Sequence, residues 1–258
     1  MQYNLKELPN GIRIIHMEVP HTRMVHSGFI LNIGSRDESK EQEGLVHFWE
    51  HMAFKGTKKR KAFHIINRLE SLGGELNAYT TKEKVCFYAT ILKEHFNKAA
   101  ELLCDITFNS TFPEKQIEKE RQVILEEMAM YRDSPEDAIQ DEFDELVFEG
   151  HALGRNILGT EETVGKFSQQ DFFDFISSRM DTTNIVFSVV GNISFKKVLN
   201  QVEGYLTSIP AKRSLYIRSG YNQYTPKSKV IEKDITQAHC AIGKPAFSIY
   251  DPKRFKLY

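Results

Sequence analysis

The sequence has few cysteines and no long hydrophobic run. Three cysteines, an odd number, are spread over 258 residues, and so sparse a set excludes a small fold held together by disulfides. Cys86 and Cys104 fall in apolar runs and are expected to be small buried residues. Cys240 follows His239, and adjacent residues on a strand point in different directions, which argues against a catalytic or metal pair. No apolar stretch approaches the roughly 18 residues that a membrane-spanning helix needs.

An excess of charge of one sign is also missing. The net charge is −1, which excludes the strong basic excess of a nucleic-acid-binding face. The one basic cluster, Lys58–Lys61, is interpreted as a solvated loop or helix entrance, with a contact to an acidic substrate as the alternative. The N-terminus has no basic region followed by an apolar one, so no signal peptide is expected and the location is predicted to be cytoplasmic. We therefore expect no nucleic acid and no membrane among the partners.

Periodic hydrophobic patterns indicate the fold class. Hydrophobic residues make up 41% and charged residues 27% of the chain, which is typical of a globular protein that is long enough to bury a core. Periodicity and turn residues predict strands at 11–18, 23–33, 75–80, 85–92 and 185–190, and helices at 42–54, 62–72, 94–107, 114–132, 136–148, 169–179 and 195–207. This order predicts an α+β fold with a mixed or antiparallel sheet and helices packed on it, because strands and helices do not alternate as in βαβ units.

One predicted helix carries the candidate chemistry. It contains His47-Phe-Trp-Glu50-His51. On a helix, a residue shares one face with the residues three and four positions after it. Both histidines can therefore bind one metal ion, while Glu50 can reach a water molecule on it. The order His-x-x-Glu-His is typical of inverted zincin metallopeptidases. The alternative is an amphipathic helix with two surface histidines, but the neighbouring apolar residues leave little of the helix to water: Val46, Phe48, Trp49, Met52 and Phe54.

A third ligand is available on the predicted helix 114–132. A catalytic zinc usually has three protein ligands and one open position. The helix offers five carboxylates, and spacing does not choose among Glu114, Glu118, Glu120, Glu126 and Glu127. Glu120 and Glu127 are seven apart and share a face, so one could bind the metal while the other holds a ligand or the active-site water. The alternative is that all five are solvated surface charges.

Four motifs, in this order, resemble the pitrilysin/insulinase-type peptidases, which include the mitochondrial processing peptidases and their bacterial relatives. They are Gly44–Thr57, which resembles the active-site helix, and then Gly73–Thr80, Glu120–Glu127 and His151–Gly159. Thr236–Gly243 resembles the opening strand of the family's second domain. The resemblance covers essentially the whole chain, and it implies the fold of a pitrilysin-type N-terminal domain, which is LuxS/metallohydrolase-like.

The resemblance also implies a reaction and its residues. It implies a zinc-dependent endopeptidase that hydrolyses extended peptides, with one Zn²⁺ per chain. His47, His51 and Glu127 would bind the zinc. Glu50 would be the catalytic residue that takes a proton from water and passes it to the leaving amine. Glu120 would be the partner that holds a ligand or the water.

Further residues are implied to bind the substrate. The family's edge strand maps to Asn77, Ala78 and Tyr79, and such an edge binds an extended peptide by adding it as a strand. Phe54 matches a pocket residue of the family, and a plain core position is its alternative.

The domain organisation is expected to have three parts. Residues 1–210 would be the zinc-binding catalytic domain, 211–228 a linker, and 229–258 the truncated start of a second, similar domain, with two short strands within 229–247. Because the family encloses its substrate between two halves, we expect a peptide substrate and a second homologous half or subunit as partners. On its own the chain is expected to bind zinc and to be weakly active or inactive.

Two other functions compete with this one. The chain could be a catalytically silent scaffold or partner subunit of a processing-peptidase-like complex, but such family members lose the motif residues that are intact here. It could instead carry a structural zinc site, which usually has four protein ligands, and no fourth candidate stands out.

Overall fold

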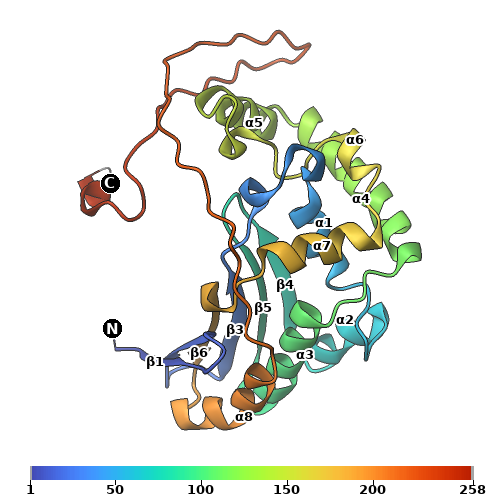
Figure 1. The fold of residues 1–258 in the computed structure, drawn as a ribbon, viewed down its shortest axis with the longest axis vertical. Helices are drawn as coiled ribbons and strands as arrows, with labels where there is room; N and C mark the ends of the chain where they lie inside the picture. The colour runs from blue at the N-terminus through green and yellow to red at the C-terminus, as the bar shows by residue number, and fades with distance from the viewer. Residues whose placement is uncertain (1, 257–258) are drawn as a thin grey trace.

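The computed structural model describes residues 2–256, and its centre is one six-stranded sheet (Figure 1). The strand order is β1-β2-β6-β3-β5-β4. The strands are β1 (Asn4–Glu7), β2 (Arg13–Glu18), β3 (Met24–Leu31), β4 (Glu75–Thr80), β5 (Val85–Leu92) and β6 (Ile185–Gly191). Among these strands β2 and β6 pair in parallel, and all other neighbours are antiparallel. The predicted mixed sheet is therefore confirmed.

The core lies on one face of this sheet. Phe29 on β3 pairs with Phe87 on β5 and with Phe187 on β6, and all three side chains are fully buried. Alternate residues of β6 are buried, as expected when one face of a strand packs on a core. Trp49 from α1 (Leu45–Met52) packs on Phe87, with ring centroids 5.8 Å apart. The sheet and the motif helix therefore share one hydrophobic core.

Eight α-helices accompany the sheet in the described chain. Besides α1 they are α2 (Ala62–Glu70), α3 (Phe96–Phe108), α4 (Glu114–Asp133), α5 (Pro135–Val147), α6 (Glu161–Val164), α7 (Gln169–Arg179) and α8 (Phe195–Thr207). In Figure 1, α1, α2, α4 and α7 lie to one side of the sheet, and α5 lies near one end of the molecule. All seven predicted helices are present, whereas α6 and β1 were not predicted. None of the helices described is both long and apolar enough to cross a membrane.

The last part of the chain departs from the prediction. Residues 210–247 are all described, and they form neither helix nor strand. The two short strands predicted within 229–247 are therefore wrong. Most side chains there are exposed, and a strand needs a paired neighbour to satisfy its backbone groups. We call residues 210–233 the strap; it runs from the end of α8 along the molecule towards α5 (Figure 1).

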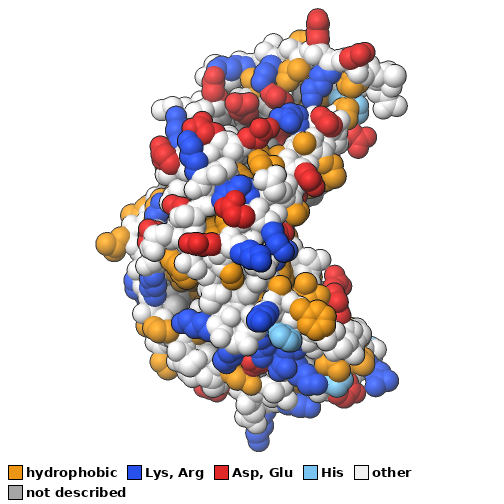
Figure 2. Space-filling view, turned by 90° about the vertical axis from the view of Figure 1, so that its right-hand side faces the viewer, with side chains coloured by type: hydrophobic (Ala, Val, Ile, Leu, Met, Phe, Trp, Pro, Cys, Tyr) orange, Lys and Arg blue, Asp and Glu red, His pale blue; other side chains and the backbone are white. Residues whose placement is uncertain are grey.

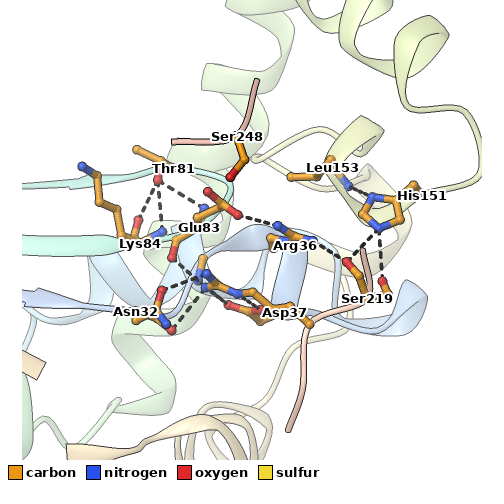
Figure 3. A network of polar contacts seen from close by, with 12 residues as sticks. Asn32, Arg36, Asp37, Thr81, Glu83, Lys84, His151, Leu153, Ser219 and Ser248 are labelled. Atoms are coloured by element: carbon orange, nitrogen blue, oxygen red, sulfur yellow. Dashed lines mark hydrogen bonds and ion pairs between the residues drawn. The ribbon is translucent and has the colours of Figure 1, made fainter. Parts of the chain in front are cut away.

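The strap is held by polar contacts (Figure 3). Arg218 donates hydrogen bonds to both carboxylate oxygens of Asp37 at 2.7 Å and to the carbonyl of Glu83 at 2.7 Å. Arg36 donates to the Glu83 carboxylate and, at 2.7 Å, to the carbonyl of Ser219. The strap thus lies against the turn that joins β4 to β5.

The distribution of charge on the surface and the burial of two cysteines agree with what the sequence indicates. Acidic and basic side chains are interspersed on the face shown in Figure 2, with hydrophobic side chains scattered among them. Cys86 and Cys104 are buried, as predicted. Cys240 is exposed and lies in the stretch without strands.

Candidate metal centre

The helix that carries the motif is fixed at its N-terminus by a buried carboxylate. Glu38 accepts hydrogen bonds from the backbone N–H groups of Gly44, at 3.0 Å, and Val46, at 2.7 Å. These are two of the N–H groups that a helix leaves without an internal partner. Burial raises the pKa of Glu38 well above its ordinary value, although both N–H groups act to lower it. Glu38 therefore does for α1 what a capping side chain does elsewhere.

A second segment packs against the same helix end. Gly44 and Gly159 both have positive φ, of 93° and 77°. A Cβ on Gly44 would lie 2.4 Å from the carbonyl oxygen of Leu158, and one on Gly159 would lie 2.1 Å from the carbonyl oxygen of Glu43. Only glycine fits at either position. The motif His151–Gly159 thus contributes a close backbone contact that holds the start of α1.

The structure brings the predicted metal ligands together. Nε2 of His47 lies 3.7 Å from Oε1 of Glu127, and Nε2 of His51 lies 3.5 Å from Oε2 of Glu127. One ligand atom from each of the three lies within 4.8 Å of the others. Ligand atoms about 2 Å from a tetrahedral zinc lie about 3.3 Å from one another. The donor set and its spacing therefore fit a zinc ion.

The protonation of His47 and the contacts of His51 also suit a metal. Burial, followed by the positive charge of His51, lowers the pKa of His47 to about 3, so His47 is a neutral imidazole at neutral pH, which is the form that binds metals. Nδ1 of His51 lies 3.3 Å from Oε1 of Glu120, and its Nε2 faces Glu127. A carboxylate at Nδ1 is the usual means of directing the other ring nitrogen of a histidine to a metal.

Glu120 has a second partner that was not predicted. Its Oε2 lies 2.6 Å from Nζ of Lys55. Burial acts to raise the pKa of Glu120, but the hydrogen bonds of His51 and Lys55 outweigh it and hold the pKa below its ordinary value. The adjacent Arg121 is buried and donates to the carbonyls of Val164 and Phe167, which anchors this part of α4.

Glu50 lies beside the three candidate ligands and is held by the neighbouring strand. Thr80 Oγ1, at the end of β4, donates a 2.6 Å hydrogen bond to Oε2 of Glu50. Burial raises the pKa of Glu50, the contacts with Thr80 and His51 lower it, and Glu127 raises it. The net rise brings the carboxylate closer to the range in which a general base works well. Thr80 was not predicted as a site residue, although its place two residues after Ala78 puts both on one face.

The predicted substrate-binding residues lie at the edge of the sheet. β4 is the last strand in the strand order. The N–H of Ala78 donates to Oδ1 of Asn77 at 2.8 Å, so it is turned away from β5. Because main-chain groups alternate along a strand, Ala78 presents its N–H and C=O to the free edge, whereas those of Asn77 and Tyr79 face β5. The side chains of Asn77 and Tyr79 lie on the sheet face opposite to Thr80. Phe54 is partly buried and packs against the core.

Comparison with known proteins identifies the family. Residues 13–161, more than half of the chain, match the family model described as Insulinase (Peptidase family M16). The chain belongs to peptidase family M16. Residues 166–258 match a second model of this family, described as Peptidase M16 inactive domain. β6 falls in the second match, yet it lies between β2 and β3, so both matched segments build the same M16 sheet.

Relatives and solved structures extend this result. An uncharacterized zinc protease of Rickettsia felis is 36% identical over 242 residues, which are 93% of this chain and 58% of the relative. The uncharacterized zinc protease YmxG of Bacillus subtilis is 38% identical over 234 residues, 91% of this chain and 57% of the relative. The chain thus spans little more than half the length of these curated M16 relatives.

Two solved structures share the fold. A protease from Helicobacter pylori has a TM-score of 0.80 at 22% identity, over 84% of this chain and 53% of that chain. The periplasmic protease PqqL from Escherichia coli has a TM-score of 0.78 at 24% identity, over 84% of this chain and 25% of that chain. At these identities the likeness bears on the M16 fold alone.

Proposed function

We propose that this chain is the zinc-binding part of a metalloendopeptidase that hydrolyses extended peptides. The observation that carries the proposal is the convergence of His47, His51 and Glu127, with Glu50 beside them. The description of the relatives as zinc proteases supports the choice of metal and of reaction. One zinc ion per chain matches the single three-residue cluster of metal-binding groups in the described residues.

Each residue of the site has its own role in the proposed reaction. When bound, the zinc ion supplies a Lewis acid that polarises the scissile carbonyl and makes water more acidic. Glu50 takes the proton of the attacking water and passes it to the leaving amine. Thr80 holds Oε2 of Glu50, which leaves Oε1 for the water. Glu120 orients His51 through its Nδ1.

The substrate would add to the free edge of β4. An extended peptide adds to such an edge through main-chain hydrogen bonds, and Ala78 presents its main-chain groups there. Asn77 has to release the Ala78 N–H before a peptide can accept from it. In this proposal residues 1–210 are the catalytic domain, 211–228 link it to a second domain that begins at 229, and a second homologous half or subunit completes the substrate chamber.

Zinc content and peptide hydrolysis measured on the same sample test the proposal. The chain is assayed with a quenched-fluorescent peptide, alongside the variants Glu50→Gln and Glu126→Gln. Glu126 is an exposed residue of α4 and provides the matched control. We expect about one zinc ion per chain in all three proteins. In whichever protein cleaves the peptide, this chain or the full-length protein, we expect Glu50→Gln to lose at least about a hundredfold in hydrolysis, because general-base catalysis contributes that much or more. Glu126→Gln should keep the activity.

Each outcome has a definite meaning. Cleavage that a chelator abolishes and that Glu50→Gln lacks supports a peptidase in which the chain suffices. Zinc binding without cleavage sends the assay to the full-length protein, where the same two variants are compared. Substantial activity in Glu50→Gln removes Glu50 from the mechanism, and a chain that takes up no zinc refutes the metal site.

A further inference from the structure

Lys55 is linked to His51 through the carboxylate of Glu120. Its Nζ lies 2.6 Å from Oε2 of Glu120, whose Oε1 lies 3.3 Å from Nδ1 of His51. The three side chains form a continuous chain from the residues after α1 to α4 and back to α1. The Glu120 side chain is 9% exposed and that of Lys55 is 27% exposed. The ion pair is therefore largely shielded from water. In such surroundings the attraction between two opposite charges is stronger than at the surface.

Both oxygens of the Glu120 carboxylate have one partner each. With Oε2 held by Lys55, Oε1 stays directed at Nδ1 of His51, which favours the tautomer that carries its proton on Nδ1. The lone pair of Nε2 then faces Glu127. By contrast, Nδ1 of His47 is buried and has no hydrogen-bond partner within the described chain. Of the two histidines, His51 is thus the one that a side chain orients.

The charges around the site give Lys55 a second role. Among the ion pairs of the described residues, Lys55 is the one lysine or arginine that contacts Glu120, and none contacts Glu50 or Glu127. A buried carboxylate without a compensating charge is costly, so Lys55 allows Glu120 to stay buried next to His51.

We infer that Lys55 is a positioning residue of the zinc site, which acts by holding Glu120 so that Glu120 orients His51 for the metal. This inference rests on the proposed zinc site and adds to it a residue outside the His-x-x-Glu-His motif. It predicts that Lys55 and Glu120 act as one unit, because, among the side-chain hydrogen bonds and ion pairs of the described residues, Lys55 is linked to the proposed metal ligands only through Glu120.

Zinc affinity tests the inference without any need for peptidase activity. The dissociation constant for zinc is measured by competition with a chromophoric chelator for the chain and for Lys55→Met, Glu120→Gln and the double variant. Loss of the carboxylate that orients a metal-bound histidine weakens binding about ten- to a hundredfold, and we expect this for Glu120→Gln. For Lys55→Met we expect about three- to tenfold weaker binding. The double variant should bind no more weakly than Glu120→Gln alone, because residues that act as one unit are not additive.

Two further variants control for charge and folding. Lys58→Met removes one positive charge from an exposed position nearby and should leave the zinc affinity unchanged. Lys55→Arg keeps a donor and a charge and should restore most of the affinity, so it preserves the test if Lys55→Met fails to fold. The visible absorption spectrum of the protein loaded with Co²⁺ reports the ligand geometry, and it should change in Lys55→Met but not in Lys58→Met.

Three results overturn the inference. Unchanged zinc binding by Lys55→Met would mean that Lys55 does not contribute to the site. Tighter binding would mean that its charge only repels the metal. Losses that add up in the double variant would mean that Lys55 acts independently of Glu120. Either result leaves the proposed zinc site intact. A chain that binds no zinc overturns the proposed function, and the inference falls with it.

Discussion

Replacing Arg218 with methionine should release the strap. Asp37 is 3% exposed and Arg218 is 21% exposed, and without the guanidinium Asp37 keeps the N–H of Gly34 as a hydrogen-bond donor. Breaking a buried ion pair by removing one partner costs about 3–5 kcal/mol. Because Arg218 is partly exposed and the strap can detach while the core stays folded, we expect a smaller cost of about 2 kcal/mol. This corresponds to about a thirtyfold larger population of detached strap.

Limited proteolysis measures that population. Tyr221 lies on the strap, with its ring centroid 5.0 Å from that of Phe148 and 5.4 Å from that of His151. Cleavage by chymotrypsin after Tyr221 therefore requires the strap to detach, and its rate follows the detached population when reattachment is faster than cleavage. Mass spectrometry identifies the cleavage site, and we expect an increase of about thirtyfold for Arg218→Met.

Another arginine of the strap provides the control. Arg213 is 73% exposed and lies 3.8 Å from Asp181. Exposed ion pairs contribute little, so Arg213→Met should change the rate of cleavage after Tyr221 by less than about fivefold. Equal cleavage rates in Arg213→Met and Arg218→Met would refute the argument that the buried pair holds the strap. The midpoint of thermal unfolding should stay nearly constant in both variants, because neither arginine is part of the hydrophobic core.

Three other predictions concern the site. Thr80→Val should lower kcat about ten- to a hundredfold in steady-state kinetics, since a hydrogen bond to a charged group is worth about 1.5–3 kcal/mol. Zinc content and KM should stay constant, and Thr80→Ser should restore the rate. A changed zinc content would contradict a role in holding Glu50. Glu38→Ala leaves two helix N–H groups without a partner and should lower the free energy of unfolding in urea by about 2–4 kcal/mol, and an unchanged midpoint would contradict the capping role. The folded-state pKa of His47, about 3, lies below its ordinary value of 6.5, so the unfolded chain binds the proton first. The neutral, buried His47 therefore stabilises the folded metal-free protein fully above pH 6.5. This contribution to the free energy of unfolding is lost on acidification, by up to about 5 kcal/mol near pH 3. Urea unfolding across this range should be less pH-dependent in His47→Gln, and an identical pH dependence would contradict the burial of a neutral His47.

Periodicity predicted most of the fold because most elements have one buried and one exposed face. β6 buries alternate residues and α8 buries Val198, Val202 and Leu206, and such patterns are readable from sequence. β1 has four residues, none of them buried, and α6 is a single turn, so neither has enough residues to show a period. The residues wrongly predicted as strands within 229–247 are suitable for strands, but no strand of residues 2–256 lies beside them. Sequence periodicity does not report whether a pairing partner exists.

The candidate site was predictable to the extent that its chemistry is local. His47, Glu50 and His51 lie on one turn of helix, so their spacing alone predicts a shared site. The proposed third ligand lies on another helix, and spacing left five carboxylates open until the resemblance indicated Glu127. The structure places Glu127 beside both histidines. The residues that hold the site were missed for the same reason: Thr80 is 30 positions from Glu50, and no local pattern pairs them.

The residues around the motif show what it needs in order to hold a metal. A helix of eight residues is too short to be stable alone, and a ligand that rotates freely loses metal affinity. Glu38 fixes the start of α1, Thr80 holds the proposed base Glu50, and Glu120 with Lys55 orients the proposed ligand His51. None of these side chains is among the proposed ligands or bases. A chain with an intact His-x-x-Glu-His motif but without these contacts should therefore bind zinc weakly, so the motif alone is not sufficient to predict a working metal centre.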